Sequence, residues 1–65
     1  MRQTDLEQAL IDLLKLTNLS KANRGIVFLQ LDGDRQILRM CEYLLENEQA
    51  TDEQILSEAK RISKQ

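Results

Sequence analysis

Apolar residues recur at helical spacing along most of this chain, and four such stretches predict four short helices. The predicted helices cover residues 5–16, 21–31, 35–47 and 52–63. Polar residues with capping or turn chemistry separate them. We therefore predict an all-α fold, a compact bundle of four short helices that forms one domain over residues 1–65.

The first and the last helix each begin with a capping-box sequence. In such a box the first side chain accepts from a backbone N–H three residues on, and the fourth side chain reaches back. The boxes run from Thr4 to Glu7 and from Thr51 to Gln54. Apolar stripes follow both boxes, at Leu6, Ala9, Leu10, Leu13 and Leu14, and at Ile55, Leu56, Ala59 and Ile62. Asn18 is predicted to be a left-handed residue that ends the first helix.

The second helix, capped by Ser20, contains a run whose apolar side chains point in nearly every direction: Ile26, Val27, Phe28, Leu29 and Leu31. A helix that is apolar all round cannot face solvent on any side, so we predict that helix 21–31 is the innermost one. The same run is also typical of a β-strand, and an intermolecular strand pair in a dimer is the alternative. We favour the helix, because no second strand candidate exists to pair with. Gly25 would then mark the close approach of another backbone.

The sequence Asp32-Gly33-Asp34 predicts a helix end followed by a helix start. Gly33 suits the position after the second helix, and Asp34 suits the cap of the third. The buried face of the third helix should consist of Ile37, Met40, Cys41, Leu44 and Leu45. Its outer face should carry Arg35, Gln36, Arg39, Glu42 and Glu46.

Composition narrows the possible chemistry. The chain has no histidine and one cysteine, Cys41, which excludes an intrachain disulfide and leaves no donor set for zinc. Cys41 lies on an apolar stripe without a histidine partner, so a buried inert thiol is predicted rather than a nucleophile. We expect no enzyme activity, cofactor or metal. No stretch resembles a signal peptide or a membrane span, and a cytoplasmic location without a membrane partner is expected.

The interaction hypothesis comes from an apparent apolar surplus on the second and third helices. Either this surplus belongs entirely to the core, or it also forms a surface for a partner helix or a second copy of the chain. In the latter case we expect a small non-catalytic interaction module, including the option of a homodimer. The residues expected to carry this interface are Phe28, Leu31, Met40 and Tyr43.

The alternative hypothesis is a DNA-binding regulator. The second helix, a short turn with glycine and the third helix give a helix-turn-helix outline. The candidate nucleic-acid contacts are Lys21, Arg24, Arg35, Gln36 and Arg39. The net charge of −2 and the acidic residues near the start of the third helix argue against this hypothesis.

A resemblance rests on four segments: residues 19–20, Gly25-Ile26-Val27-Phe28-Leu29, Met40-Cys41-Glu42-Tyr43-Leu44, and the stretch 50–56. In these segments the chain resembles short helical proteins encoded in phage and conjugative elements of Gram-positive bacteria. The resemblance covers about the last two thirds of the chain. It implies an all-α fold and an accessory role on a mobile element, and it assigns no activity to any residue.

Overall fold

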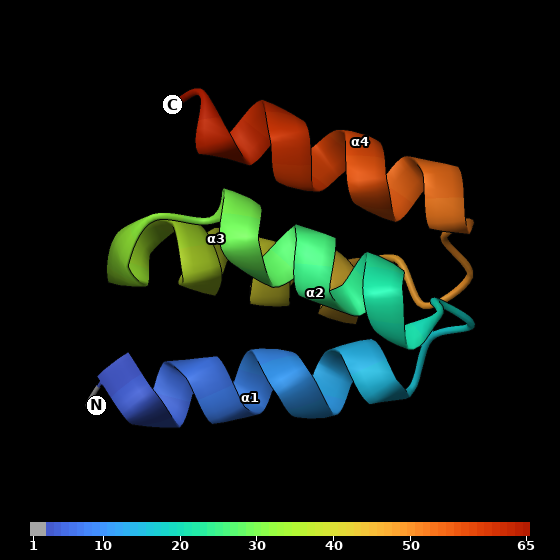
Figure 1. Ribbon diagram of the computed structural model, residues 1–65, viewed down its shortest axis with the longest axis horizontal. Coiled ribbons are helices and arrows are strands. Elements are labelled where there is room, and N and C mark those ends of the chain that lie inside the picture. The colour runs from blue at the N-terminus through green and yellow to red at the C-terminus, as the bar shows by residue number, and fades with distance from the viewer. Residues whose placement is uncertain (1–2) are drawn as a thin grey trace.

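The amphipathic stripes of the sequence form four helices: α1 (Gln3–Lys15), α2 (Lys21–Gln30), α3 (Gly33–Glu46) and α4 (Asp52–Ser63) (Figure 1). The computed structural model describes residues 3–65, with side chains from Asp5 onward. Within this range the chain contains no β-strand, so the predicted all-α bundle is confirmed. The run that could have been a strand lies in α2, and only its last residue, Leu31, is extended.

Local hydrogen bonds define the starts of α2 and α4 as the sequence predicts. Ser20 Oγ accepts from the backbone N–H of Asn23 at 3.2 Å, which caps α2. A complete capping box joins Thr51 to Gln54 at the start of α4. α1 begins earlier than expected, at Gln3, so the backbone of Thr4 is already helical; the Thr4 side chain predicted to cap this helix lies outside the described residues.

The end of α1 differs from the prediction. Among the described residues none other than glycine has a positive φ, so Asn18 is not a left-handed cap. Thr17 closes the helix instead. Its hydroxyl donates to the carbonyl oxygen of Leu14 at 2.6 Å and accepts from the backbone N–H of Leu19 at 3.2 Å. The Leu14 carbonyl also accepts from the backbone N–H of Thr17 at 3.1 Å, so Thr17 satisfies the end of the helix through both its backbone and its side chain, without a left-handed residue.

The junction between α2 and α3 also differs in detail. Gly33 has the positive φ of +83° that favours glycine, but it starts α3 rather than ending α2. Asp34 lies in the first turn of α3, so the prediction that it caps this helix is wrong. The cap position is Asp32, whose side chain makes no capping bond; its backbone N–H donates to Gln36 Oε1 at 2.7 Å.

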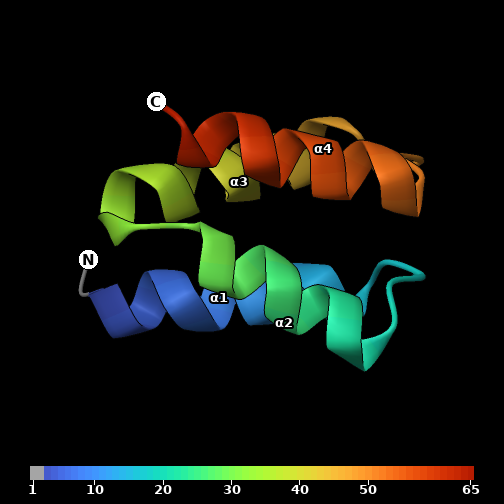
Figure 2. The ribbon, with the colours of Figure 1, turned by 45° about the horizontal axis from the view of Figure 1, so that its top comes forward.

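In the described part of the chain, three pairs of helices pack closely against each other, so the four helices follow one another in space in the order α1, α3, α4, α2. α1 packs on α3, α3 on α4, and α4 on α2. No other pair of helices within residues 3–65 brings its backbones together to the same extent, and α1 and α2 are held apart. In Figure 1 α1 and α4 lie at opposite edges of the molecule, with α2 and α3 between them; in the turned view of Figure 2 α3 is seen behind α4. None of the described helices has the length and apolar character needed to cross a membrane.

The core lies between the four helices. Its largest fully buried side chains are Leu10, Leu14, Val27, Met40, Ile55 and Ile62. Most of the predicted inward faces are confirmed, including that of Cys41.

The prediction that the second helix is innermost is wrong. Val27 is the only buried residue within α2, whereas α3 buries four residues. The reason is that the side between α1 and α2 stays open, so the all-round apolar surface of α2 is only partly covered.

Candidate functional site

The open side between α1 and α2 forms an apolar groove of about 440 Å³, which we call the α1–α2 groove. It is lined by Ile11, Leu14 and Lys15 of α1 and by Lys21, Arg24, Gly25, Phe28 and Leu29 of α2. None of these lining residues is acidic. The groove exists because α1 and α2, although consecutive in the chain, each pack on a different neighbour.

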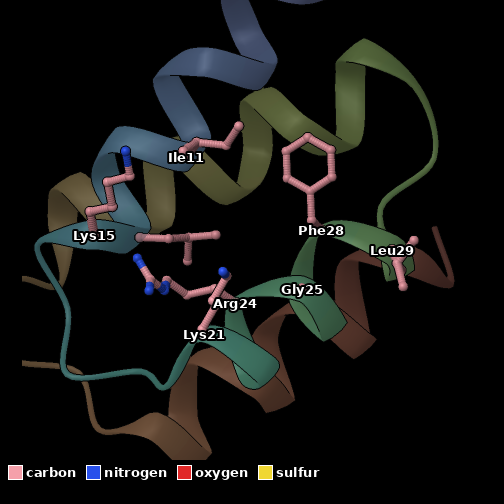
Figure 3. Close-up of a pocket in the computed structure, with 8 residues that line it drawn as sticks. Ile11, Lys15, Lys21, Arg24, Gly25, Phe28 and Leu29 are labelled. Carbon is pink, nitrogen blue, oxygen red and sulfur yellow. The ribbon is translucent and has the colours of Figure 1, made fainter.

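Apolar and charged side chains occupy different ends of the groove (Figure 3). Ile11 projects from α1 and the Phe28 ring rises from α2 at one end. Lys15, Lys21 and Arg24 gather at the other end, where α1 finishes and α2 begins. This polarity follows from the sequence, because Lys15 is the last residue of α1 and Lys21 is the first residue of α2.

The apolar end of the groove contains a strongly exposed side chain, since Leu29 is 86% exposed. Ile26 on the same helix is also exposed but does not line the groove. Phe28 is half-buried and packs against the core, while Leu14 is buried. Gly25 has no neighbouring atom within 4 Å of where a Cβ would stand, so the expected close approach of another backbone does not occur. The absent side chain leaves space in the groove instead.

The Arg24 side chain contains a polar atom that is shielded from solvent. Its Nε atom is shielded from solvent and has no hydrogen-bond partner among the described residues. Figure 3 shows the side chain reaching from α2 toward the end of α1, on the same side as Lys15. In this position an incoming acceptor cannot reach Nε, because an atom that water cannot contact is closed to an acceptor oxygen as well; a turn of the Arg24 side chain would present the guanidinium to the groove.

The structure separates the four residues predicted to form an interaction surface. Phe28 lines the α1–α2 groove. Leu31 is 9% exposed and Met40 is 0% exposed, so the expectation that these two are surface residues is wrong; both complete the core. Tyr43 is half-buried and packs against the core from α3. The sequence reasoning missed Ile11, Lys15 and Leu29 as groove residues, because nothing in the chain signals that α1 and α2 stay apart.

The five candidate nucleic-acid contacts do not form one surface. Lys21 and Arg24 line the α1–α2 groove at the start of α2, whereas Arg35 follows the other end of that helix. Gln36 accepts from the Asp32 backbone and donates through Nε2 to the Gln65 carbonyl oxygen at 3.4 Å.

Arg39, the fifth of these contacts, lies in a shallow hollow whose lining includes three glutamates: Glu42, Glu46 and Glu58. Carboxylates in that position repel phosphates.

A second hollow of about 280 Å³ lies where the ends of α1 and α3 meet, and exposed Leu16 and Leu45 line it. The prediction that Leu45 belongs to the buried face of α3 is therefore wrong. Unlike the α1–α2 groove, this hollow includes many polar side chains: Thr17, Asn18, Asn47, Glu48 and Gln49. It is the less apolar of the two surfaces.

Among the residues that the structure describes, two groups have shifted pKa values, and neither shift indicates a reactive group. Burial, and secondarily the negative charge of Glu42, raise the pKa of the Cys41 thiol above its usual value. A hydrogen bond from Arg61 to Glu58, together with the charge of that carboxylate, raises the pKa of Arg61. This pair is an exposed ion pair within α4. Across the described residues no three His, Cys, Asp or Glu side chains gather as a metal site.

The chain matches no protein-family model, no curated protein and no solved structure. The resemblance to proteins of phage and conjugative elements therefore stays a prediction, and the function has to be argued from the groove itself.

Proposed function

We propose that this chain is a small non-catalytic interaction module and that its α1–α2 groove receives a helix from a partner protein. The observation that carries the proposal is the groove's combination of an apolar lining with the nearly complete exposure of Leu29. Docking of an amphipathic helix into an apolar groove is a recurrent mode of recognition.

The energetic case rests on apolar area. Burying a large aliphatic or aromatic side chain contributes roughly 1.5–3 kcal/mol relative to leaving it exposed. A helix laid between α1 and α2 would cover Leu29, Ile11 and the exposed part of Phe28 together. Gly25 would let that helix approach α2 closely, since no Cβ stands in its way.

The non-catalytic part of the proposal rests on residue chemistry. The chain lacks histidine, the commonest general base, and its one thiol is buried with a raised pKa. A cytoplasmic location also belongs to this proposal, because a free buried cysteine is compatible with a reducing compartment. An accessory role on a mobile element is a further part that only the sequence resemblance supports.

The test is a selection of helical peptides from a display library against the full chain, followed by binding to two variants. Leu29→Asp places a charge in the groove, and Leu38→Asp places the same charge on an exposed leucine of α3 that does not line it. Selected peptides should bind Leu29→Asp at least about tenfold more weakly and bind Leu38→Asp as they bind the unaltered chain. Peptides that bind Leu29→Asp as tightly as the unaltered chain would contradict the proposal. A selection that yields no binding peptide would contradict it too.

A further inference from the structure

The charge at one end of the α1–α2 groove is positive, whereas the net charge of the protein is negative. The chain has 11 acidic and 9 basic residues, a net charge of −2. Nevertheless the groove is lined by Lys15, Lys21 and Arg24 and by no acidic side chain. Such a local reversal of sign selects partners of complementary charge and excludes those of like charge.

We propose that the groove binds an acidic amphipathic helix of a different protein. Apolar side chains of that helix lie between Ile11, Phe28 and Leu29, and its carboxylates face the cationic end. This inference rests on the function proposed above and specifies the chemistry of the partner.

Arg24 supports a carboxylate in particular. Its Nε–H is shielded from water and lacks a hydrogen-bond partner among the described residues, which is unfavourable, so a turn of the side chain that brings the guanidinium to an incoming carboxylate recovers the missing hydrogen bond. A carboxylate can accept from Nε and from a terminal guanidinium nitrogen at once, which a single carbonyl oxygen does less well. Lys15 and Lys21 are exposed beside it and add positive charge without fixed geometry.

The dimensions of the groove set the pattern that the partner must carry. From Lys21 to Leu29, α2 rises about 12 Å at 1.5 Å per residue. Lys21 and Arg24 occupy the cationic part of this length, so the apolar residues of the partner helix, at positions i, i+3, i+4 and i+7, start at Phe28 and Leu29 and continue away from Lys21. Its acidic residues then fall in the adjacent turn, beside the junction between α1 and α2.

Two other occupants fit the observations less well. A symmetric pair of these chains joined groove to groove would place the two sets of Lys15, Lys21 and Arg24 near each other if the grooves ran parallel, and would set these cations against the apolar end of the other groove if they ran antiparallel; neither arrangement pairs the cations with a carboxylate of the groove. A small anionic amphiphile would satisfy the cations but would leave Leu29, which is 86% exposed at the rim, largely uncovered. An acidic helix both covers the apolar rim and neutralises the cations.

The experiment titrates the ¹⁵N-labelled full chain with two synthetic helical peptides of about four turns. Both carry leucines at i, i+3, i+4 and i+7; one places glutamates in the following turn, and the other places lysines there. The glutamate peptide should shift the amide signals of Lys21, Arg24 and Leu29. It should bind about tenfold more tightly than the lysine peptide, as a few exposed ion pairs allow, and this preference should shrink as salt rises.

Matched charge reversals supply the control. The double variant Lys15→Glu/Lys21→Glu should prefer the lysine peptide. Lys60→Glu/Lys64→Glu makes the same change in net charge at the C-terminal end of α4, away from the groove, and should keep the preference for glutamate. Far-ultraviolet circular dichroism verifies that both variants are folded.

The remaining outcomes separate the two proposals. Equal binding of both peptides at the groove would overturn the acidic partner and leave the interaction function standing. Concentration-dependent dimerisation that shifts the same groove signals would also overturn the acidic partner and leave the interaction function standing, because a second copy of the chain would then occupy the groove. If neither peptide shifts the groove signals, both proposals fail. If sodium decanoate shifts them while the peptides do not, the groove is an amphiphile site and both proposals are again wrong.

Discussion

Thr51 and Gln54 exchange two hydrogen bonds at the start of α4. Thr51 Oγ1 accepts from the Gln54 backbone N–H at 3.2 Å, and Gln54 Oε1 accepts from the Thr51 backbone N–H at 2.9 Å. Two backbone donors that the helix geometry leaves unpaired are thereby satisfied. α4 contributes the buried Ile55, Ala59 and Ile62 to the core, so the stability of its first turn affects the whole bundle.

Replacing Thr51 should therefore destabilise the fold measurably. Thr51→Ala removes the acceptor and should lower the free energy of unfolding by about 1 kcal/mol. Thr51→Ser keeps a hydroxyl and should cost much less. Urea denaturation followed by circular dichroism measures both values, and equal losses for the two variants would show that the capping bond contributes nothing.

Leu29 and Leu31 lie only two positions apart, but replacing each by alanine should change the free energy of unfolding by very different amounts. Leu31 is 9% exposed and belongs to the core, so Leu31→Ala should lower the free energy of unfolding by about 2–3 kcal/mol. Leu29 is 86% exposed, so Leu29→Ala should change it by less than about 0.5 kcal/mol. Thermal and urea unfolding give both values, and a large loss at Leu29 would mean that it is covered within the chain.

The two glycines offer another matched comparison. Gly25 lies in the interior of α2 with nothing within 4 Å of a Cβ, so Gly25→Ala should raise the free energy of unfolding by about 0.5–1 kcal/mol. Gly33 also has open space, but its φ of +83° disfavours any side chain, and Gly33→Ala should cost about 1–2 kcal/mol. Chemical denaturation measures both changes. The same sign for both would contradict the backbone argument.

Cys41 should make stability depend on pH in the alkaline range. Burial first, and then Glu42, raise the pKa of this thiol above its usual value of 9.0. The folded chain therefore keeps the proton at pH values where the unfolded chain has lost it. Because the unfolded state then binds fewer protons, the free energy of unfolding falls as pH rises above about 9. Below that pH the thiol is neutral in both states and contributes no pH dependence.

The measurement compares unfolding of the unaltered chain with that of Cys41→Ala in reducing buffer from pH 7 to 10. All other groups are common to both proteins, so only the difference between the two slopes reports on the thiol. The unaltered chain should lose stability more steeply above pH 9. Parallel slopes would mean that the thiol ionises equally in the folded and unfolded states.

Sequence patterns predicted the features that depend on neighbours within one or two turns. The caps at Ser20 and Thr51 join residues three apart, so they can be predicted from the sequence without knowledge of any tertiary contact. The inward faces of α3 and α4 follow from the 3.6-residue period, and Ile37 and Ile55 are buried as expected. The helix ends were less predictable, because Thr17 and Gln36 satisfied groups that a backbone conformation or another cap could also have satisfied.

The sequence by itself determined that this chain is an all-α bundle, where two of its helices are capped, and which faces of its helices are mostly buried. Short-range periodicity is enough to predict the helices and their buried faces, and local hydrogen bonds are enough to predict the caps. Only the tertiary structure decided that α1 and α2 stay apart, that Leu29 is exposed while Leu31 is covered, and that Lys15, Lys21 and Arg24 share one end of a groove. The physical reason is that α2 is apolar on nearly every face. Its own pattern therefore cannot select which face is covered, and that choice depends on how helices distant in sequence pack against it.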